Sequence, residues 1–327
     1  MPLRTLLLTS VLLFSQTFAA DRGCFDFFPG SYKIIGGHPS FAVGVNRFVS
    51  MKCPDRKKVV AHDRFRGICL FEERASKPLY LSDAKPPLYI CPDKTESKHP
   101  IRTYPVSVYA GELAKRPGHE GALFSGCCRL AGIFDGEGRW FDAEAIRRLL
   151  EGDTSHSDVG ARFAEKKIGV VVDSVDPFAG SGLMPGDKIL KAGSFDHPSL
   201  RKTRELVDGC RVGERLTFGV ERNGKSVSVE APCFDRRGGG VLSDTFLERF
   251  GMHFSKSLRI SEIDTSSISY KKGLRVGDRL LMIDGKPVGG EAEVREVLSG
   301  YAVQKRTPEN MLWEREGFQF FLLPTSL

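Results

Sequence analysis

The sequence predicts a mainly β fold with short helices, made of an N-terminal β-rich domain and two copies of a smaller β unit. The segment GLMPGDKIL begins at Gly182, and GLRVGDRLL begins 91 residues later at Gly273. The same offset aligns RELVDG at Arg204 with REVLSG at Arg295, without a gap. Such a match indicates a repeated structural unit. The region before residue 150 is rich in β-branched and turn residues, which favours strands.

The first residues have the pattern of a cleaved export signal. Arg4 precedes an apolar run from Leu6 to Phe14, and Thr17 and Ala19 occupy the two small-residue positions before the expected cleavage. Residues 1–19 are therefore predicted to be a signal peptide and take no part in the fold. Later apolar runs are too short to cross a membrane. We expect a protein of the bacterial periplasm with no transmembrane segment.

Composition argues against several other classes. Hydrophobic residues make up 41% and charged residues 27% of the chain, as in ordinary globular proteins. The net charge of +7 is spread along the sequence, and no block of Lys and Arg alternates with aromatic residues, so nucleic acid is not expected as a partner. The spacing of Cys and His residues matches no metal motif, and we expect neither a metal nor another cofactor.

Cysteines are numerous for an exported protein of this size. An even number in an oxidising compartment indicates disulfides. The chain has eight: Cys24, Cys53, Cys69, Cys91, Cys127, Cys128, Cys210 and Cys233. The first six lie before residue 150, and their connectivity does not follow from the sequence. For the last two, a turn at Asn223–Gly224 places Cys233 opposite Glu214, close to Cys210, which predicts a Cys210–Cys233 disulfide.

Each repeat has the same predicted order of elements. An apolar strand is followed by a short helical turn, a Gly-Asp turn into a second strand, a helix and a closing hairpin. In the first hairpin the Asn-Gly turn sets a register with three apolar pairs on one face. These pairs are Leu216 with Ala231, Phe218 with Val229 and Val220 with Val227. In the second hairpin, a turn at Glu316–Gly317 pairs Trp313 with Phe320.

This order resembles a PDZ domain in the arrangement of bacterial exported proteases. The resemblance implies PDZ domains at 156–234 and 245–327, with a linker at 235–244, and protein partners bound as an added strand. It also implies a loop of the form apolar-Gly-apolar that receives a peptide carboxylate, followed by the accepting strand. The residues that fit are Phe250, Gly251, Met252, His253 and Phe254 in the second copy, and Val159, Gly160 and Ala161 in the first.

A domain followed by two PDZ copies resembles the HtrA (DegP-like) family of trypsin-fold serine proteases. VVAHDRFRGICLFE, from Val59 to Glu72, is similar to the family strand that carries the catalytic Asp. LFSGCCRLAGIFDGEGRWFDAEAIRRLL is similar to the segment with the catalytic Ser, its return strand and the helix before the first PDZ domain. In it, FDAEAIRRLLEG at 141–152 has helical apolar spacing. Residues 20–152 are therefore expected to form a degenerate trypsin-like domain.

The resemblance places degenerate residues at the catalytic positions. The family Asp falls on Gly67, the family Ser falls on Ser125, and Leu123–Phe124 stand where the oxyanion loop has Gly-Asn. These losses predict no peptidase activity. The alternative is an unconventional triad of Ser125, His38 or His62, and Asp63.

The function expected from this layout is a non-catalytic PDZ scaffold of the periplasm that forms homo-oligomers. Degenerate relatives with this layout occur in the disks around campylobacterial flagellar motors. The alternatives are an active envelope serine protease and a peptide-binding adaptor or chaperone. The last residues, Thr325 to Leu327, have the form of a PDZ ligand, so the tail of one copy is a candidate ligand for the groove of another.

Overall fold

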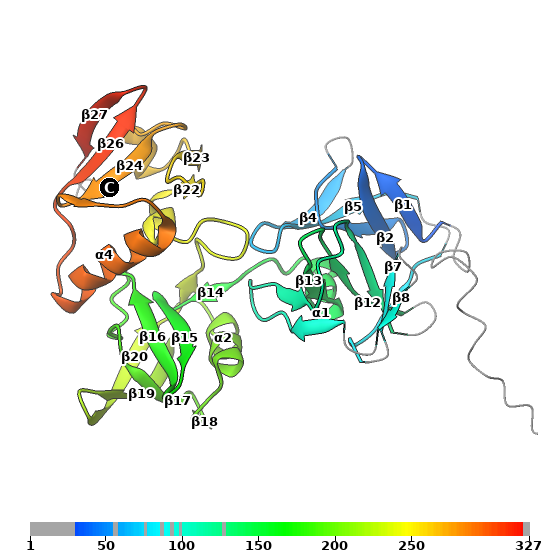
Figure 1. The fold of residues 1–327 in the computed structure, drawn as a ribbon, viewed down its shortest axis with the longest axis horizontal. Coiled ribbons are helices and arrows are strands. Elements are labelled where there is room, and N and C mark those ends of the chain that lie inside the picture. The colour runs from blue at the N-terminus through cyan, green and yellow to red at the C-terminus, as the bar shows by residue number, and fades with distance from the viewer. Residues whose placement is uncertain are drawn as a thin grey trace, which may run out of the picture.

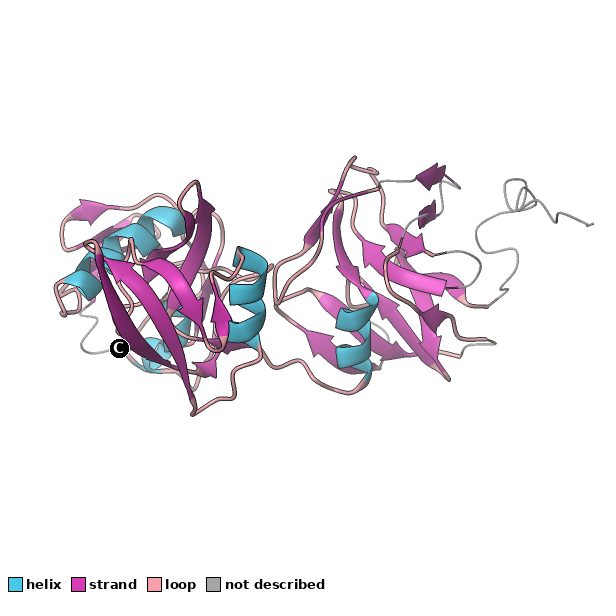
Figure 2. Ribbon diagram, turned by 90° about the horizontal axis from the view of Figure 1, so that it is seen from below, coloured by secondary structure: helices cyan, strands magenta, loops and turns pink. Residues whose placement is uncertain are grey.

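The structure is a computed structural model that describes residues 30–54, 58–74, 77–85, 88–91, 95–97, 100–125 and 129–322. The predicted signal peptide and the tail from Thr325 to Leu327 lie outside the described residues. The N-terminal domain lies at one end of the molecule and the two repeats lie at the other (Figure 1). Strands dominate and the helices are short (Figure 2), as predicted. None of the described helices is long and apolar enough to cross a membrane.

The N-terminal domain contains two antiparallel sheets. The first has the order β1-β2-β3-β5-β4. Its strands are β1 (Tyr32–Ile35), β2 (His38–Gly44), β3 (Arg47–Ser50), β4 (Val59–Asp63) and β5 (Ile68–Glu72). The second has the order β8-β7-β11-β12-β13-β10-β9, with β6 added in parallel to β12. Its strands are β6 (Tyr80–Leu81), β7 (Leu88–Cys91), β8 (Thr95–Ser97), β9 (Ile101–Thr103), β10 (Gly111–Leu113), β11 (Gly121–Phe124), β12 (Arg129–Phe134) and β13 (Arg139–Asp142).

One apolar core joins these two sheets. Phe41 and Leu70 from the first sheet and Ile133 from the second belong to the same buried cluster. Helix α1 (Ala143–Leu150) completes this cluster with Ile146 and Leu149, at the position predicted for a helix. Its N-cap is Asp142, whose carboxylate accepts the N–H of Ala145 at 3.1 Å. The helix therefore closes the domain immediately before the first repeat.

The first repeat has the predicted order of strands, helix and hairpin and the predicted hairpin register, but the short helical turn expected between Val175 and Lys188 is an irregular turn rather than a helix. Leu216 faces Ala231, Phe218 faces Val229 and Val220 faces Val227. Asn223 and Gly224 both have positive φ, of 52° and 74°, as a type I′ turn requires. The elements are β14 (Ser157–Asp158), β15 (Ala161–Lys166), β16 (Gly169–Val175), β17 (Lys188–Ala192), β18 (Phe195–Asp196), α2 (Leu200–Asp208), β19 (Arg215–Arg222), β20 (Lys225–Pro232) and β21 (Phe234–Asp235).

The second repeat follows the same plan, and Trp313 faces Phe320 as predicted. Its core is built around Trp313, Leu298 and Leu274, all of which are fully buried. The elements are the 3₁₀ helix η2 (Leu247–Phe250), β22 (Met252–Phe254), β23 (Ile260–Ile263), α3 (Ile268–Lys271), β24 (Arg279–Ile283), β25 (Lys286–Pro287), α4 (Glu291–Val303), β26 (Met311–Arg315) and β27 (Phe318–Leu322).

The predicted Cys210–Cys233 disulfide is confirmed. It closes the base of the first hairpin, where the N–H of Cys233 donates to the carbonyl of Glu214 at 2.9 Å. A second disulfide joins Cys53 to Cys69 in the N-terminal domain. Cys91 is also disulfide-bonded. Cys24, Cys127 and Cys128 lie outside the described residues.

A buried histidine connects the N-terminal domain to the first repeat. His156 is 3% exposed. Its Nδ1 lies 2.8 Å from Asp208 of α2, and its Nε2 lies 3.2 Å from Asp63 at the end of β4. The ring thus bridges the carboxylates of Asp63 and Asp208. Arg66 and Arg148 supply a cation to Asp63 and Asp208 respectively, at 2.8 and 3.0 Å.

Replacing His156 is expected to destabilise the protein. In His156→Asn the carboxylates of Asp63 and Asp208 lose the hydrogen bonds of the ring that joins them, and a hydrogen bond to a charged group contributes about 1.5–3 kcal/mol. Urea denaturation at pH 7, followed by circular dichroism, measures this loss in the free energy of unfolding. The matched control is His197→Asn, because His197 is exposed. A loss below about 1 kcal/mol for His156→Asn would show that the cluster does not hold the two domains together.

Candidate functional site

The apolar-Gly-apolar loop of the second repeat is built as a tight turn after η2. Gly251 has φ of 82°, and a Cβ at this position would lie 2.4 Å from the Cβ of Ser267. Glycine is therefore required here. The carbonyl of Gly251 accepts the N–H of Asp264 at 2.8 Å, which fixes the turn before β22 begins.

The loop of the first repeat has the same construction. Gly160 has φ of 69°, and a Cβ here would lie 2.3 Å from the Cβ of Ala179. Its carbonyl accepts the N–H of Asp176 at 2.8 Å. Its own N–H donates to the Asp158 carboxylate at 2.8 Å. The backbone N–H of Gly160, between Val159 and Ala161, is therefore already hydrogen-bonded to a carboxylate of the chain and is not free for a peptide carboxylate.

Each loop leads into a strand with one unpaired edge. Among the described strands, β15 is an edge strand that pairs only with β16, and β22 pairs only with β23. The second edge of each strand is therefore the place for an added peptide strand. Arg204 of α2 and Arg295 of α4 are equivalent positions of the repeat, and each reaches toward this space. Both arginines begin the duplicated motif, RELVDG and REVLSG, so their equivalent positions in the repeat could have identified them as groove residues from the sequence.

A residue of the N-terminal domain closes the first of these spaces. The guanidinium of Arg204 lies 4.1 Å from the ring centre of Tyr109 and donates to the carbonyl of Phe163, in β15, at 3.4 Å. Arg236 donates to the Tyr109 hydroxyl at 3.1 Å. Burial and the neighbouring arginines Arg236 and Arg162 together lower the pKa of Arg204. Sequence analysis missed Tyr109, because no local pattern marks a contact with a residue almost one hundred positions away.

Buried charges hold the two repeats together. Arg162 of β15 donates to both oxygens of Asp244 at 2.7 and 2.6 Å, and to Asp158 at 2.8 Å. Burial opposes the charge of Asp244, but Arg162 outweighs it and holds the pKa of Asp244 at about 2. Arg249 pairs with Asp176 at 2.7 Å on the same side. Asp244, at the end of the segment predicted as a linker, residues 235–244, thus contacts both repeats, whereas Val241 of the same segment bonds to Phe65 of the N-terminal domain.

The residues proposed for catalysis have separate partners. Ser125 lies 2.5 Å from the hydroxyl of Ser82. His38 of β2 lies 2.9 Å from Glu120. The contacts described for Ser125 include no histidine, so the unconventional triad is not assembled in this structure.

The other three positions lie in β4 and in the turn that follows it: His62 and Asp63 end β4, and Gly67 ends the turn before β5. Asp63 is buried and binds Arg66 and His156. Burial would raise the pKa of Asp63, but the hydrogen bond from His156 and the charge of Arg66 lower it. Gly67 has φ of 69° and faces Val241, whose side chain would lie 3.3 Å from an added Cβ.

A cleft of about 380 Å³ lies beside this turn in the N-terminal domain. His62 and Gly67 line it together with Glu120 and Arg139, whereas Ser125 does not. Burial and the charge of Arg64 lower the pKa of His62, so its ring is favoured as the neutral base.

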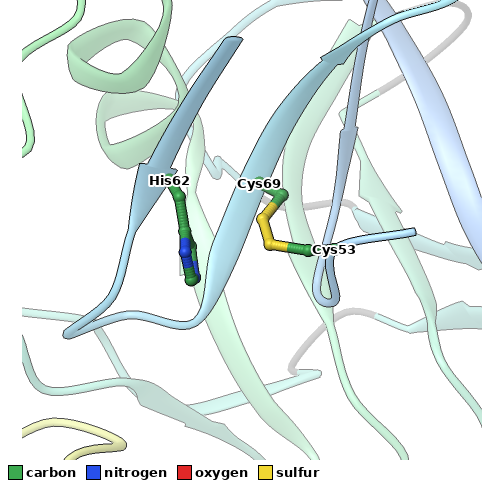
Figure 3. Close-up of side chains that lie close together, drawn as sticks. All are labelled: Cys53, His62 and Cys69. Carbon is green, nitrogen blue, oxygen red and sulfur yellow. A yellow bond between two sulfur atoms is a disulfide. The ribbon is translucent and has the colours of Figure 1, made fainter. Parts of the chain in front are cut away.

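Three potential metal ligands lie close together near this cleft. The ligand atoms of Cys53, His62 and Cys69 all lie within 4.8 Å of one another (Figure 3). Cys53 and Cys69 form a disulfide, however, so neither offers the thiolate that a metal would need. In this oxidised state the cluster offers a single imidazole and is not a metal centre.

Family comparison identifies the two repeats. A PDZ-domain model matches residues 157–232, and a second PDZ-domain model matches residues 259–306. The chain thus has two PDZ domains, which follow a mainly β domain.

The particular relatives are proteases by name. A probable periplasmic serine endoprotease, DegP-like, from Halomonas elongata is 22% identical over 178 residues, which cover 48% of this chain. The chain spans 37% of the length of that relative. The HtrA-type protease AlgW with tripeptide shares the fold with a TM-score of 0.50 and 12% identity, over 65% of this chain and 96% of AlgW. The serine endoprotease from Yersinia pestis is 14% identical with a TM-score of 0.41, over 61% of this chain and 88% of that one.

These relatives correct one prediction. Gly67 at the position of the family Asp and Leu123–Phe124 at the oxyanion loop predicted that the chain is not an enzyme. The curated relative is named a probable serine endoprotease, which points to a protease, so that prediction is contradicted.

The carboxyl group of Glu248 is expected to make stability depend on pH. Burial and the charge of Asp244 raise its pKa from 4.5 to about 7. Between these two values the folded state keeps a proton that the unfolded state has released, so stability falls as pH rises through this window, by up to about 3 kcal/mol. Melting temperatures at pH 5 and 7.5 should differ more in wild type than in Glu248→Gln. The exposed control Glu296→Gln should behave as wild type does, and equal slopes in all three proteins would refute the assignment.

Proposed function

We propose that this protein works in a bacterial periplasm as an HtrA-like polypeptide-binding protein, with the groove of its second PDZ domain as the peptide site. The observation that carries this proposal is the loop at Gly251, which turns directly into β22, a strand with one edge left unpaired by other strands. An extended peptide would add to that edge, with its terminal carboxylate at the loop. The first PDZ domain is the lesser candidate, since the Asp158 carboxylate already accepts from its loop and Tyr109 of the N-terminal domain lies against Arg204 of its helix α2.

Support for the compartment comes from chemistry and from a relative. Two disulfides join described cysteines, and disulfides persist in oxidising compartments. The Halomonas relative is named periplasmic. The apolar N-terminal run fits an export signal. Homo-oligomerisation and a scaffold role, including a place in a PflC-type flagellar motor disk, remain predictions from the layout.

Peptide binding is tested with a fluorescein-labelled peptide that ends in Thr-Ser-Leu. Fluorescence anisotropy should show saturable binding to the oxidised full chain, and amidation of the peptide terminus should weaken it. Gly251→Ala should weaken binding at least tenfold, about 1.4 kcal/mol, because the added methyl group disrupts the loop. Gly300→Ala is the matched control, since a Cβ there meets no atom within 4 Å. Equal binding of the free and amidated peptides would refute capture at this loop.

A second candidate function is serine endoprotease activity, which the names of the relatives favour. Ser125 is the serine that the family motif assigns to the nucleophile. If it has this role, Ser125→Ala should slow casein degradation by several orders of magnitude, because the other parts of a triad contribute little without the nucleophile. Ser257→Ala is the control, as Ser257 is exposed. Casein that stays intact with wild-type protein, or is degraded equally by Ser125→Ala, rules out this role.

A further inference from the structure

The unpaired edge of β22 is in contact with the protein's own chain. The N–H of Phe254 donates to the hydroxyl of Ser243 at 2.9 Å. Ser243 is 5% exposed and comes from the segment between the two PDZ domains. A donor that an added peptide strand would use is therefore already satisfied.

The same segment is held from the helix side. The N–H of Asp244 donates to Glu291 of α4 at 3.1 Å, and its carbonyl accepts from Arg295 of α4. The segment Ser243–Phe246, which we name the groove segment, thus extends from the strand to the helix. A PDZ ligand lies between the same two walls.

The groove segment also has an apolar anchor. Phe246 is 5% exposed and packs in the core cluster of the second PDZ domain with Met252, Val294 and Leu298. Its φ of 73° lies in the left-handed region, which is strained for an aromatic residue. The segment is therefore bound under strain, and displacing it would release that strain.

We propose that the groove segment is an internal ligand of the second PDZ domain and that the external ligand which displaces it is an acidic peptide. The proposal rests on the proposed function, because it concerns the same groove. Arg162 is 11% exposed and takes both oxygens of Asp244. Displacing Asp244 would leave Arg162 with Asp158, which it shares with Arg236. A ligand that returns a carboxylate to this buried guanidinium is therefore favoured over a neutral one. The carboxylate comes from an Asp or Glu side chain that follows a hydroxyl residue, as in Ser243-Asp244.

The test uses the oxidised full chain and a fluorescein-labelled peptide, Val-Leu-Ser-Asp-Thr-Phe-Leu-Glu, which copies residues 241–248. Ser243→Ala removes one hydrogen bond of the internal ligand, so the probe should bind about three- to tenfold more tightly than to wild type. Ser261→Ala is the matched control, because the Ser261 hydroxyl donates to the carbonyl of His253 on the β23 side. If Ser243→Ala proves unfolded by circular dichroism, Glu291→Gln serves instead, since it weakens the bond to Asp244. Unchanged affinity in the folded variant overturns the proposal.

Probe variants identify the carboxylate that is read. Changing the probe Asp to Asn should weaken binding at least tenfold, whereas amidating the probe terminus should change it less. If amidation weakens binding more than the change of Asp to Asn does, the recognised group is the terminal carboxylate of the probe and not its Asp side chain, and the proposal is overturned.

Hydrogen exchange separates failure of this proposal from failure of the proposed function. Saturating probe should speed amide exchange at residues 243–246 by at least tenfold, because those residues leave the groove. Binding without faster exchange there overturns the internal ligand and leaves peptide binding intact. If no probe, including the Thr-Ser-Leu peptide, binds wild type or Ser243→Ala, both proposals are wrong.

Discussion

The arrangement of the two PDZ domains depends on neutralising one buried guanidinium, that of Arg162. It is desolvated in β15, and its two anionic partners are Asp158 of its own domain and Asp244 at the entrance to the next. An unpaired charge at this depth would cost several kcal/mol. Because Asp244 is bonded to Arg162 when no external ligand is bound, the chain that follows it starts from a fixed point. That point is next to β22 and α4, so a charge in the first domain determines what lies in the groove of the second.

The N-terminal domain joins the same system through polar contacts of its own. Tyr109 lies against Arg204 and Arg236, and His156 bonds to Asp63 and Asp208. Val241 donates to the carbonyl of Phe65 at 2.8 Å, so the segment after β21 also contacts the first domain. In Figure 1 this segment, in yellow, reaches toward the loop after β4. The three domains are thus connected by buried hydrogen bonds and ion pairs, which hold specific geometries that apolar contacts alone would not.

The parts that sequence predicted well are local in the chain. The turn at Asn223–Gly224 determines every pair of its hairpin, and the disulfide between Cys210 and Cys233 follows from that register. The helix after Asp142 follows from its cap and its apolar spacing. Contacts such as that of Tyr109 with Arg204 join distant positions and leave no periodic trace. Whether the chain is an enzyme was the hardest point to predict from the sequence, because the prediction rested on two short motif matches. The prediction was that it is not an enzyme, whereas the curated relative is named a probable serine endoprotease.

The packed groove segment affects how this protein can be divided for study. Domain boundaries normally fall in exposed, flexible chain, where proteases cut first and recombinant fragments are begun. Here Val241 is 45% exposed, but Ser243 is 5% exposed and Thr245 is fully inaccessible. Limited proteolysis should therefore spare the chain between Ser243 and Thr245 in the folded state. A recombinant fragment that begins at Thr245 would lack Ser243 and Asp244, which bond to β22 and α4, and would keep only Thr245 and Phe246 of the groove segment. In the whole protein, only the fraction of molecules whose groove is free of the internal ligand can bind a peptide. The fragment would therefore bind the peptide more tightly than the whole protein, by a factor equal to the inverse of that fraction.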